Sequence, residues 1–94
     1  TRPYGPVADS ATFIGPNGFQ ANWGPVDPVD HYIFQLATDA VFNNPHPYYD
    51  NIMVGDTLRN IHSLNSNTTY YYRVKAKIGS QISDYSNTIT VKTQ

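Results

Sequence analysis

The 94-residue sequence predicts one small antiparallel β-sandwich domain, and three observations lead to this prediction. β-Branched residues dominate, with seven Val, seven Ile and nine Thr against three Leu and six Ala, and Glu is absent. This selection favours strands over helices. Short apolar segments are separated by turn residues roughly every 8–12 positions, as in sandwiches. No stretch has the apolar spacing of three and four that an amphipathic helix needs.

Length and composition limit the classes of function. A chain of this length builds one core, and we expect residues 1–5 to be the end of a linker and residues 6–94 to form the domain. The formal charge of −1 comes without a basic stripe, which excludes nucleic acid as a partner. No apolar run reaches the length of a membrane span. Cys is absent, so packing alone must stabilise the domain. We expect the isolated domain to be a monomer.

Seven strands are expected along the chain. They cover residues 11–15, 19–23, 31–38, 49–54, 57–63, 69–77 and 85–93. The first two are joined by Pro16-Asn17-Gly18, because Asn-Gly supplies the positive φ angles of a tight turn. Leu58 and Ile61 are the expected apolar anchors of the fifth strand. Residues 78–84 contain Gly79 and are expected to form a loop.

The segment 69–77 has the clearest strand pattern in the chain. Tyr70, Tyr72 and Val74 alternate with polar or charged residues, so they face the core. Tyr71 faces the other way, on the same side as Arg73, Lys75 and Lys77. The segment therefore contributes most to the fold prediction and leaves only Tyr71 outside the core.

The spacing of Leu64 and Tyr70, with Thr68 two residues before the Tyr, resembles the strand E to strand F corner of fibronectin type III domains. Trp23 at the end of the second strand and Tyr32 at the start of the third also match that family in order. So do Ser83 and Ser86 before the last strand. The resemblance extends over residues 6–93.

The resemblance implies seven strands in two sheets, A-B-E packed on C-C′-F-G. It makes Trp23, Tyr32 and Leu64 core residues and Tyr70 the corner tyrosine, whose hydroxyl bonds to the backbone of the E–F turn. An immunoglobulin-like sandwich is the alternative, although its Cys-Trp-Cys signature is missing.

Two departures from the family pattern stand out. Ser66 takes a position where the family often has Pro, and the C to C′ connection is long and aromatic, with Phe42, Tyr48 and Tyr49. This variant resembles modules of exported multidomain bacterial proteins. The resemblance therefore implies an extracellular or cell-surface location.

No residue pattern predicts catalysis, a cofactor or a metal. Ser, His and Asp are present, but no Ser lies in a Gly-x-Ser-x-Gly elbow and the three His are widely separated. Asp27, Asp30 and Asp39 could line one end of a sandwich and hold Ca²⁺, yet each also suits a loop without a ligand. We therefore expect no enzyme.

The surplus of aromatic residues is the one feature that points to binding. Tyr48, Tyr71 and Tyr85 are the candidate contacts for a ligand or partner, because flat rings stack on sugars and anchor protein interfaces. Phe42 and Tyr49 are instead expected to fill the core beneath the long connection.

Two functional hypotheses follow. The first is a spacer or domain-docking module of a larger exported bacterial protein, with the neighbouring domains as its partners. The second is an adhesion module that binds polysaccharide or a cell-surface protein through the exposed Tyr residues and the C–C′ loop.

Overall fold

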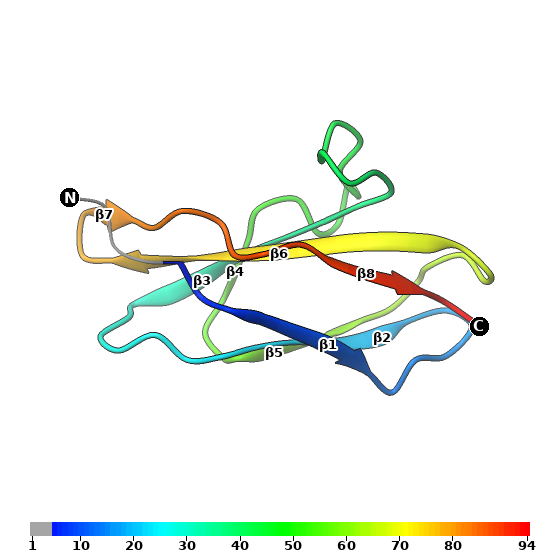
Figure 1. The fold of residues 1–94 in the computed structure, drawn as a ribbon, viewed down its shortest axis with the longest axis horizontal. Coiled ribbons are helices and arrows are strands. Elements are labelled where there is room, and N and C mark those ends of the chain that lie inside the picture. Colours follow the sequence, from blue (N-terminus) through cyan, green and yellow to red (C-terminus); the bar gives the residue numbers. More distant parts are fainter. Residues whose placement is uncertain (1–4) are drawn as a thin grey trace.

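Eight antiparallel strands form two sheets in this computed structural model, which describes residues 5–94 (Figure 1). One sheet has the order β1 (Ala8–Thr12), β2 (Phe19–Trp23) and β5 (Leu58–Ile61). The other has the order β4 (Ile52–Val54), β3 (His31–Ala37), β6 (Thr69–Ile78) and β7 (Gln81–Ile82), and β8 (Ile89–Lys92) also pairs with β6. The predicted all-β sandwich and its assignment of strands to sheets A-B-E and C-C′-F-G are confirmed. No helix that could span a membrane occurs in the part of the chain described.

The structure has one strand more than the seven predicted. Residues 78–84 were expected to form a loop, but β6 runs to Ile78 and pairs with β7 through Ile78 and Gln81. Gly79 has a φ of 61°, the left-handed conformation that glycine adopts without strain. A two-residue turn at Gly79 therefore reverses the chain into β7. The alternating pattern of a strand is absent from this short segment, so the sequence did not predict it.

The last strand is shorter than predicted because serine hydroxyls bond to β6 in place of a regular ladder. Oγ of Ser83 accepts the backbone N–H of Ala76 at 2.8 Å, and Oγ of Ser86 accepts that of Val74 at 3.0 Å. Regular pairing resumes only at Ile89. The two Ser residues of the family resemblance thus hold the segment before β8 against the sheet.

Two expectations about local features were wrong. Leu58 is 39% exposed because it pairs with Asn22 on the outer face of its sheet, whereas Ile61 is buried as expected. The turn at Asn17-Gly18 was expected to use positive φ angles, but neither residue has one. Among the described residues, Gly79 is the only Gly with positive φ. Gly18 is required there for another reason, because a Cβ would collide with the carbonyl oxygen of Ile61.

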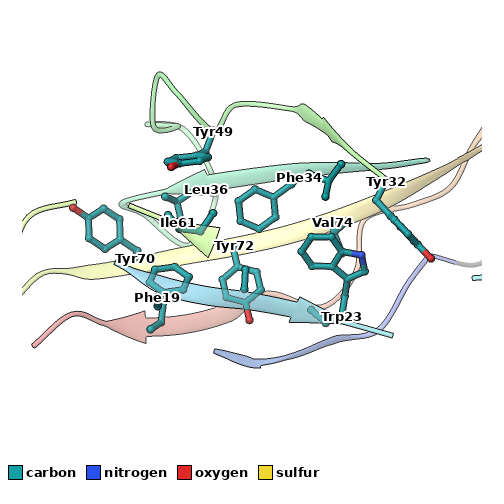
Figure 2. Packing of buried hydrophobic residues seen from close by; sticks show 14 of the residues in the cluster. Phe19, Trp23, Tyr32, Phe34, Leu36, Tyr49, Ile61, Tyr70, Tyr72 and Val74 are labelled. Carbon is teal, nitrogen blue, oxygen red and sulfur yellow. The ribbon is translucent and has the colours of Figure 1, made fainter. Parts of the chain in front are cut away.

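Aromatic rings from both sheets form the centre of the core (Figure 2). The ring of Trp23 lies 5.7 Å from that of Phe34, and the ring of Tyr72 lies 5.8 Å from Phe19 and 5.6 Å from Phe34. These distances suit favourable ring contacts. The residues assigned to the core from the sequence are all buried: Trp23, Tyr32, Leu64, Tyr70, Tyr72 and Val74.

The buried tyrosines satisfy their hydroxyls with backbone groups. The hydroxyl of Tyr32 accepts the N–H of Val26 at 2.9 Å, and that of Tyr70 accepts the N–H of Asn65 at 3.0 Å. The second bond is the one expected of a corner tyrosine. The hydroxyl of Tyr72 donates to the carbonyl of Asp9, and burial raises its pKa to about 12. Each ring therefore fills the core without leaving its polar atom unpaired.

Removing the hydroxyl of Tyr70 tests the corner. We expect Tyr70→Phe to lower the free energy of unfolding by about 1–3 kcal/mol, since the N–H of Asn65 loses its acceptor. Denaturant unfolding measures this change. Tyr71→Phe is the matched control, because no described residue hydrogen-bonds to the Tyr71 hydroxyl, and it should leave stability nearly unchanged. Equal stability of the two variants would contradict the role of the corner.

Candidate functional site

The three predicted contact residues lie on one side of the five-stranded sheet. Tyr71 is on the outer face of β6, Tyr85 is in the segment before β8, and Tyr48 is in the C–C′ loop, which we define as residues 38–51 between β3 and β4. Along β6, buried residues alternate with half-buried ones, and the half-buried residues include Tyr71, Arg73, Lys75 and Lys77. The C–C′ loop follows β3 and projects from the sheet (Figure 1). This outer face is the candidate functional site.

The first half of the C–C′ loop is ordered by one carboxylate. The Asp39 carboxylate accepts the backbone N–H groups of Asn43 and Asn44, each at 2.9 Å. These bonds, that of Asn43 first, hold the pKa of Asp39 below its ordinary value. The Asn44 amide donates to the Thr38 hydroxyl at 2.9 Å, closing the turn. Asp39 is therefore used to shape the loop.

The second half of the loop is fixed in the core by Tyr49. Its ring is buried edge-on to Phe34, and its hydroxyl accepts the backbone N–H of His62 at 3.2 Å. The carbonyl of Tyr49 accepts the N–H of Leu36 at 2.8 Å. Tyr49 thus fills the core under the loop, as expected. Phe42 was also expected in the core, but it is buried against Arg73 on the outer face and is not part of the core cluster.

Arg73 links the C–C′ loop to the segment before β8. Its guanidinium carbon lies 4.1 Å from the ring centre of Phe42 and 3.7 Å from that of Tyr85. Its Nε donates to Oε1 of Gln35 at 2.9 Å, and the Gln35 amide donates to Asp50 at 3.0 Å. We call this group of five residues the Arg73 clamp. Each cation–π contact of this kind is worth about 0.5–1 kcal/mol.

Tyr85 contributes two further contacts. Its hydroxyl donates to Oδ1 of Asn51 at 2.6 Å, and the ammonium of Lys75 lies 4.5 Å from its ring centre. The ring and the hydroxyl are thus both engaged within the domain. Tyr85 therefore helps to hold the loop and offers little surface to a ligand.

The three predicted contact residues occupy different places. Tyr48 is 73% exposed on the C–C′ loop, where its ring lies 5.7 Å from the ring of His46. Tyr71 is half-buried on the sheet, opposite Ala37 and Thr90. Among the described residues no ring contact joins any two of Tyr48, Tyr71 and Tyr85. They do not form one platform, and Tyr48 is the most accessible.

The sequence did not indicate Arg73 as a linking residue. The alternation in residues 69–77 placed Arg73 on the outer face, but its partners Phe42 and Tyr85 lie on two distant segments. The sequence contained one signal for such a contact. Arg73 lies between two other outward-facing residues, Tyr71 and Lys75, and the chain also has a long aromatic connection whose rings could pack on a guanidinium.

The part of the chain described contains no group of three or more His, Cys, Asp or Glu residues that could hold a metal. The three Asp considered for Ca²⁺ do not gather, and two have partners of their own. Asp39 orders its loop, and the carboxylate of Asp30 accepts the N–H of Gly79 at 2.8 Å.

Comparison with solved structures identifies the fold. A human fibronectin type III domain of fibronectin type III domain containing protein 3 is similar, with a TM-score of 0.76 at 19% identity over 99% of this chain and 87% of that chain. A structure of titin domains is similar with a TM-score of 0.80 at 15% identity, over 98% of this chain and 32% of that one. A β-1,2-glucanase from Parabacteroides distasonis is similar with a TM-score of 0.77 at 18% identity, over 96% of this chain and 12% of that enzyme.

This chain therefore has the fibronectin type III fold. No family model and no curated protein matches its sequence. The chain spans about a third of the titin structure and a smaller part of the glucanase. Folds of this type thus occur as one part of larger chains.

Replacing Arg73 tests whether the clamp holds the loop. We expect Arg73→Met to lower the free energy of unfolding by about 1–2 kcal/mol, the sum of two cation–π contacts. Hydrogen exchange should accelerate in residues 38–51 more than in β6, because the loop loses its attachment.

Lys77→Met is the matched control, since Lys77 lies on the same face and contacts no ring among the described residues. If the two variants have the same stability and the same exchange in the loop, the clamp does not anchor it.

Proposed function

We propose that this chain is a non-catalytic module, a spacer or domain-docking unit, of a larger exported bacterial protein. The supporting observation is the position of the chain ends in the described part. Gly5 packs against the backbone of Asp84 and Tyr85, which follow β7, whereas Gln94 hydrogen-bonds to Gly15 beside the β1–β2 turn. These places lie toward opposite ends of the longest axis, which measures 40 Å (Figure 1).

An elongated domain with its ends far apart separates the domains attached to it. The similarity to one part of a bacterial glucanase is consistent with a module that accompanies a catalytic domain. The expected linker remnant at residues 1–5 belongs to this proposal, and its first four residues lie outside the described residues. The extracellular location and the partnership with neighbouring domains are part of the same proposal.

The engaged side chains of the outer face support a structural role over a catalytic one. Arg73, Tyr85 and Gln35 bond to one another or to the C–C′ loop, so they are not directed at a substrate. One Ser lies beside a His in the described part, with Oγ of Ser63 3.1 Å from Nδ1 of His62. The two are exposed neighbours in the chain, and no described carboxylate orients the imidazole as a catalytic base requires. We therefore propose no enzymatic activity for the domain.

Replacing the module within the protein that carries it tests the spacer role. An unrelated sandwich of similar length between the same neighbours should preserve that protein's activity and its stability, because a spacer acts through length and rigidity. Deleting the module should impair them. If the replacement fails as completely as the deletion, the surface of this domain has a role of its own and the spacer proposal is wrong.

Tyr48 supports a second candidate, the binding of polysaccharide or of a cell-surface protein. It is 73% exposed, and the loop that carries it is ordered by Asp39, by Tyr49 and by the Arg73 clamp. A rigid loop loses little entropy on binding, and an exposed aromatic ring is a suitable stacking surface.

A panel of polysaccharides titrated into the 94-residue chain tests this candidate by tyrosine fluorescence. If the module binds sugars, we expect a saturable change that Tyr48→Ala abolishes. Val41→Ala is the matched control, because Val41 is 70% exposed on the same loop, and it should retain binding. A response that persists in Tyr48→Ala would exclude Tyr48 as the contact.

A further inference from the structure

A groove lies on the side of the sandwich where both sheets end. Within residues 5–94, β5 pairs only with β2 and β4 pairs only with β3, so each is an edge strand. Residues of both strands and of the turn between them line a hollow of about 610 Å³, including Met53, Leu58, Arg59, Asn60 and His62. We call it the edge groove. It is separate from the outer face that carries Tyr48 and the Arg73 clamp.

The backbone of β5 presents unpaired groups to the edge groove. The N–H of Trp23 donates to the carbonyl of Thr57, which makes these two residues a hydrogen-bonded pair. Bonded pairs alternate along an antiparallel ladder, so the N–H and C=O groups of Leu58 and Asn60 point away from β2. No described residue outside the sheet hydrogen-bonds to them. They form a short ladder on which an extended chain could add as a strand.

Arg59 lies between these two residues and is oriented differently from an ordinary surface charge. It pairs with Ala21, which is fully buried and faces the interior. Paired residues project from the same face of a sheet, so Arg59 extends from the interior side into the edge groove. Its side chain is exposed, and no described residue forms a hydrogen bond, an ion pair or a ring contact with it. By contrast, Arg73 and Lys75 on the outer face are both engaged.

The charge of Arg59 decides which strand β5 can accept. An uncharged strand added to the edge would cover the guanidinium without a counter-charge, which is unfavourable. A second copy of this chain, paired through Leu58 and Asn60, would place Arg59 opposite Arg59, and like charges in that position repel. A strand with a carboxylate opposite Arg59 meets neither obstacle, because it forms a charge-assisted bond.

We propose that the edge groove binds an extended acidic peptide of a partner protein, which adds to β5 as a further strand. Its main chain bonds to Leu58 and Asn60, and its carboxylate bonds to Arg59. This mode combines main-chain bonds, which give affinity, with one side-chain contact, which gives specificity. The site does not depend on the spacer role of the domain.

A pair of peptides tests the proposal on the 94-residue chain. One is a capped heptapeptide that alternates Thr and Val around a central Asp, and the other has Asn in place of the Asp. Amide chemical shifts of the labelled chain report both site and affinity. We expect the largest shifts at Leu58 and Asn60, and roughly tenfold tighter binding of the Asp peptide, on the scale of a charge-assisted bond.

Arg59→Gln should remove the preference for Asp, and the variant should fold because Arg59 has no partner among the described residues. Lys92→Gln is the matched control, since it removes the same charge from an exposed site on β8 and should keep the preference. Equal affinity of the unmodified chain for both peptides would overturn the proposal. So would a preference that survives in Arg59→Gln, shifts confined to the outer face, or dimerisation of the chain through β5.

Discussion

Tyr72 is the residue on which the two sheets most depend. Its ring is fully buried and contacts Phe19 of β2 and Phe34 of β3, which belong to different sheets (Figure 2). Its hydroxyl reaches the carbonyl of Asp9 in β1. One side chain of β6 therefore fixes the distance between the sheets and attaches the first strand. A ring of this size with a polar tip suits that place, since the core is apolar and its border is polar.

The same use of tyrosine explains how a domain without Cys is stabilised. Tyr32, Tyr49 and Tyr70 each bury a ring and bond to a backbone group of a loop or strand end, at Val26, His62 and Asn65 respectively. Every such bond attaches a loop to the core and satisfies a backbone group that would otherwise lack a partner. In effect, hydroxyl-to-backbone bonds fasten the loops where many small extracellular domains use disulfides.

The aromatic surplus that suggested a binding surface thus serves mainly the interior and the C–C′ loop. Phe42 and Tyr85 contact Arg73 and Tyr49 enters the core, whereas Tyr48 is largely exposed. The edge groove is the more specific of the proposed binding surfaces, because the outer backbone groups of β5 and the Arg59 side chain have no partner among the described residues. A module that spaces its neighbours and also accepts an added strand would combine a mechanical role with recognition. The two proposed roles would use different parts of the domain, its two ends and the edge at β5.

The sequence by itself determined the fold class and the inner face of β6. In residues 69–77 the side chains alternate with a period of two, and a single slip of register would reverse core and surface. Tyr70, Tyr72 and Val74 could therefore be assigned to the core without coordinates. The corner bond of Tyr70 could be expected as well, because Leu64 and Tyr70 are close in sequence and the contact is local.

Only the tertiary structure decided the properties that depend on distant segments. The β6–β7 hairpin at Gly79 was missed because a two-residue strand carries no periodic pattern. The Arg73 clamp forms only once the C–C′ loop folds back over β6 and the segment before β8 passes beside it. Arg59 looks like an ordinary surface charge until its pairing with Ala21 fixes the side from which it projects. The alternation of side chains along one strand can be read from the sequence. The register of paired strands and the packing of loops depend on contacts between distant segments, so they are set only when the sheets have assembled.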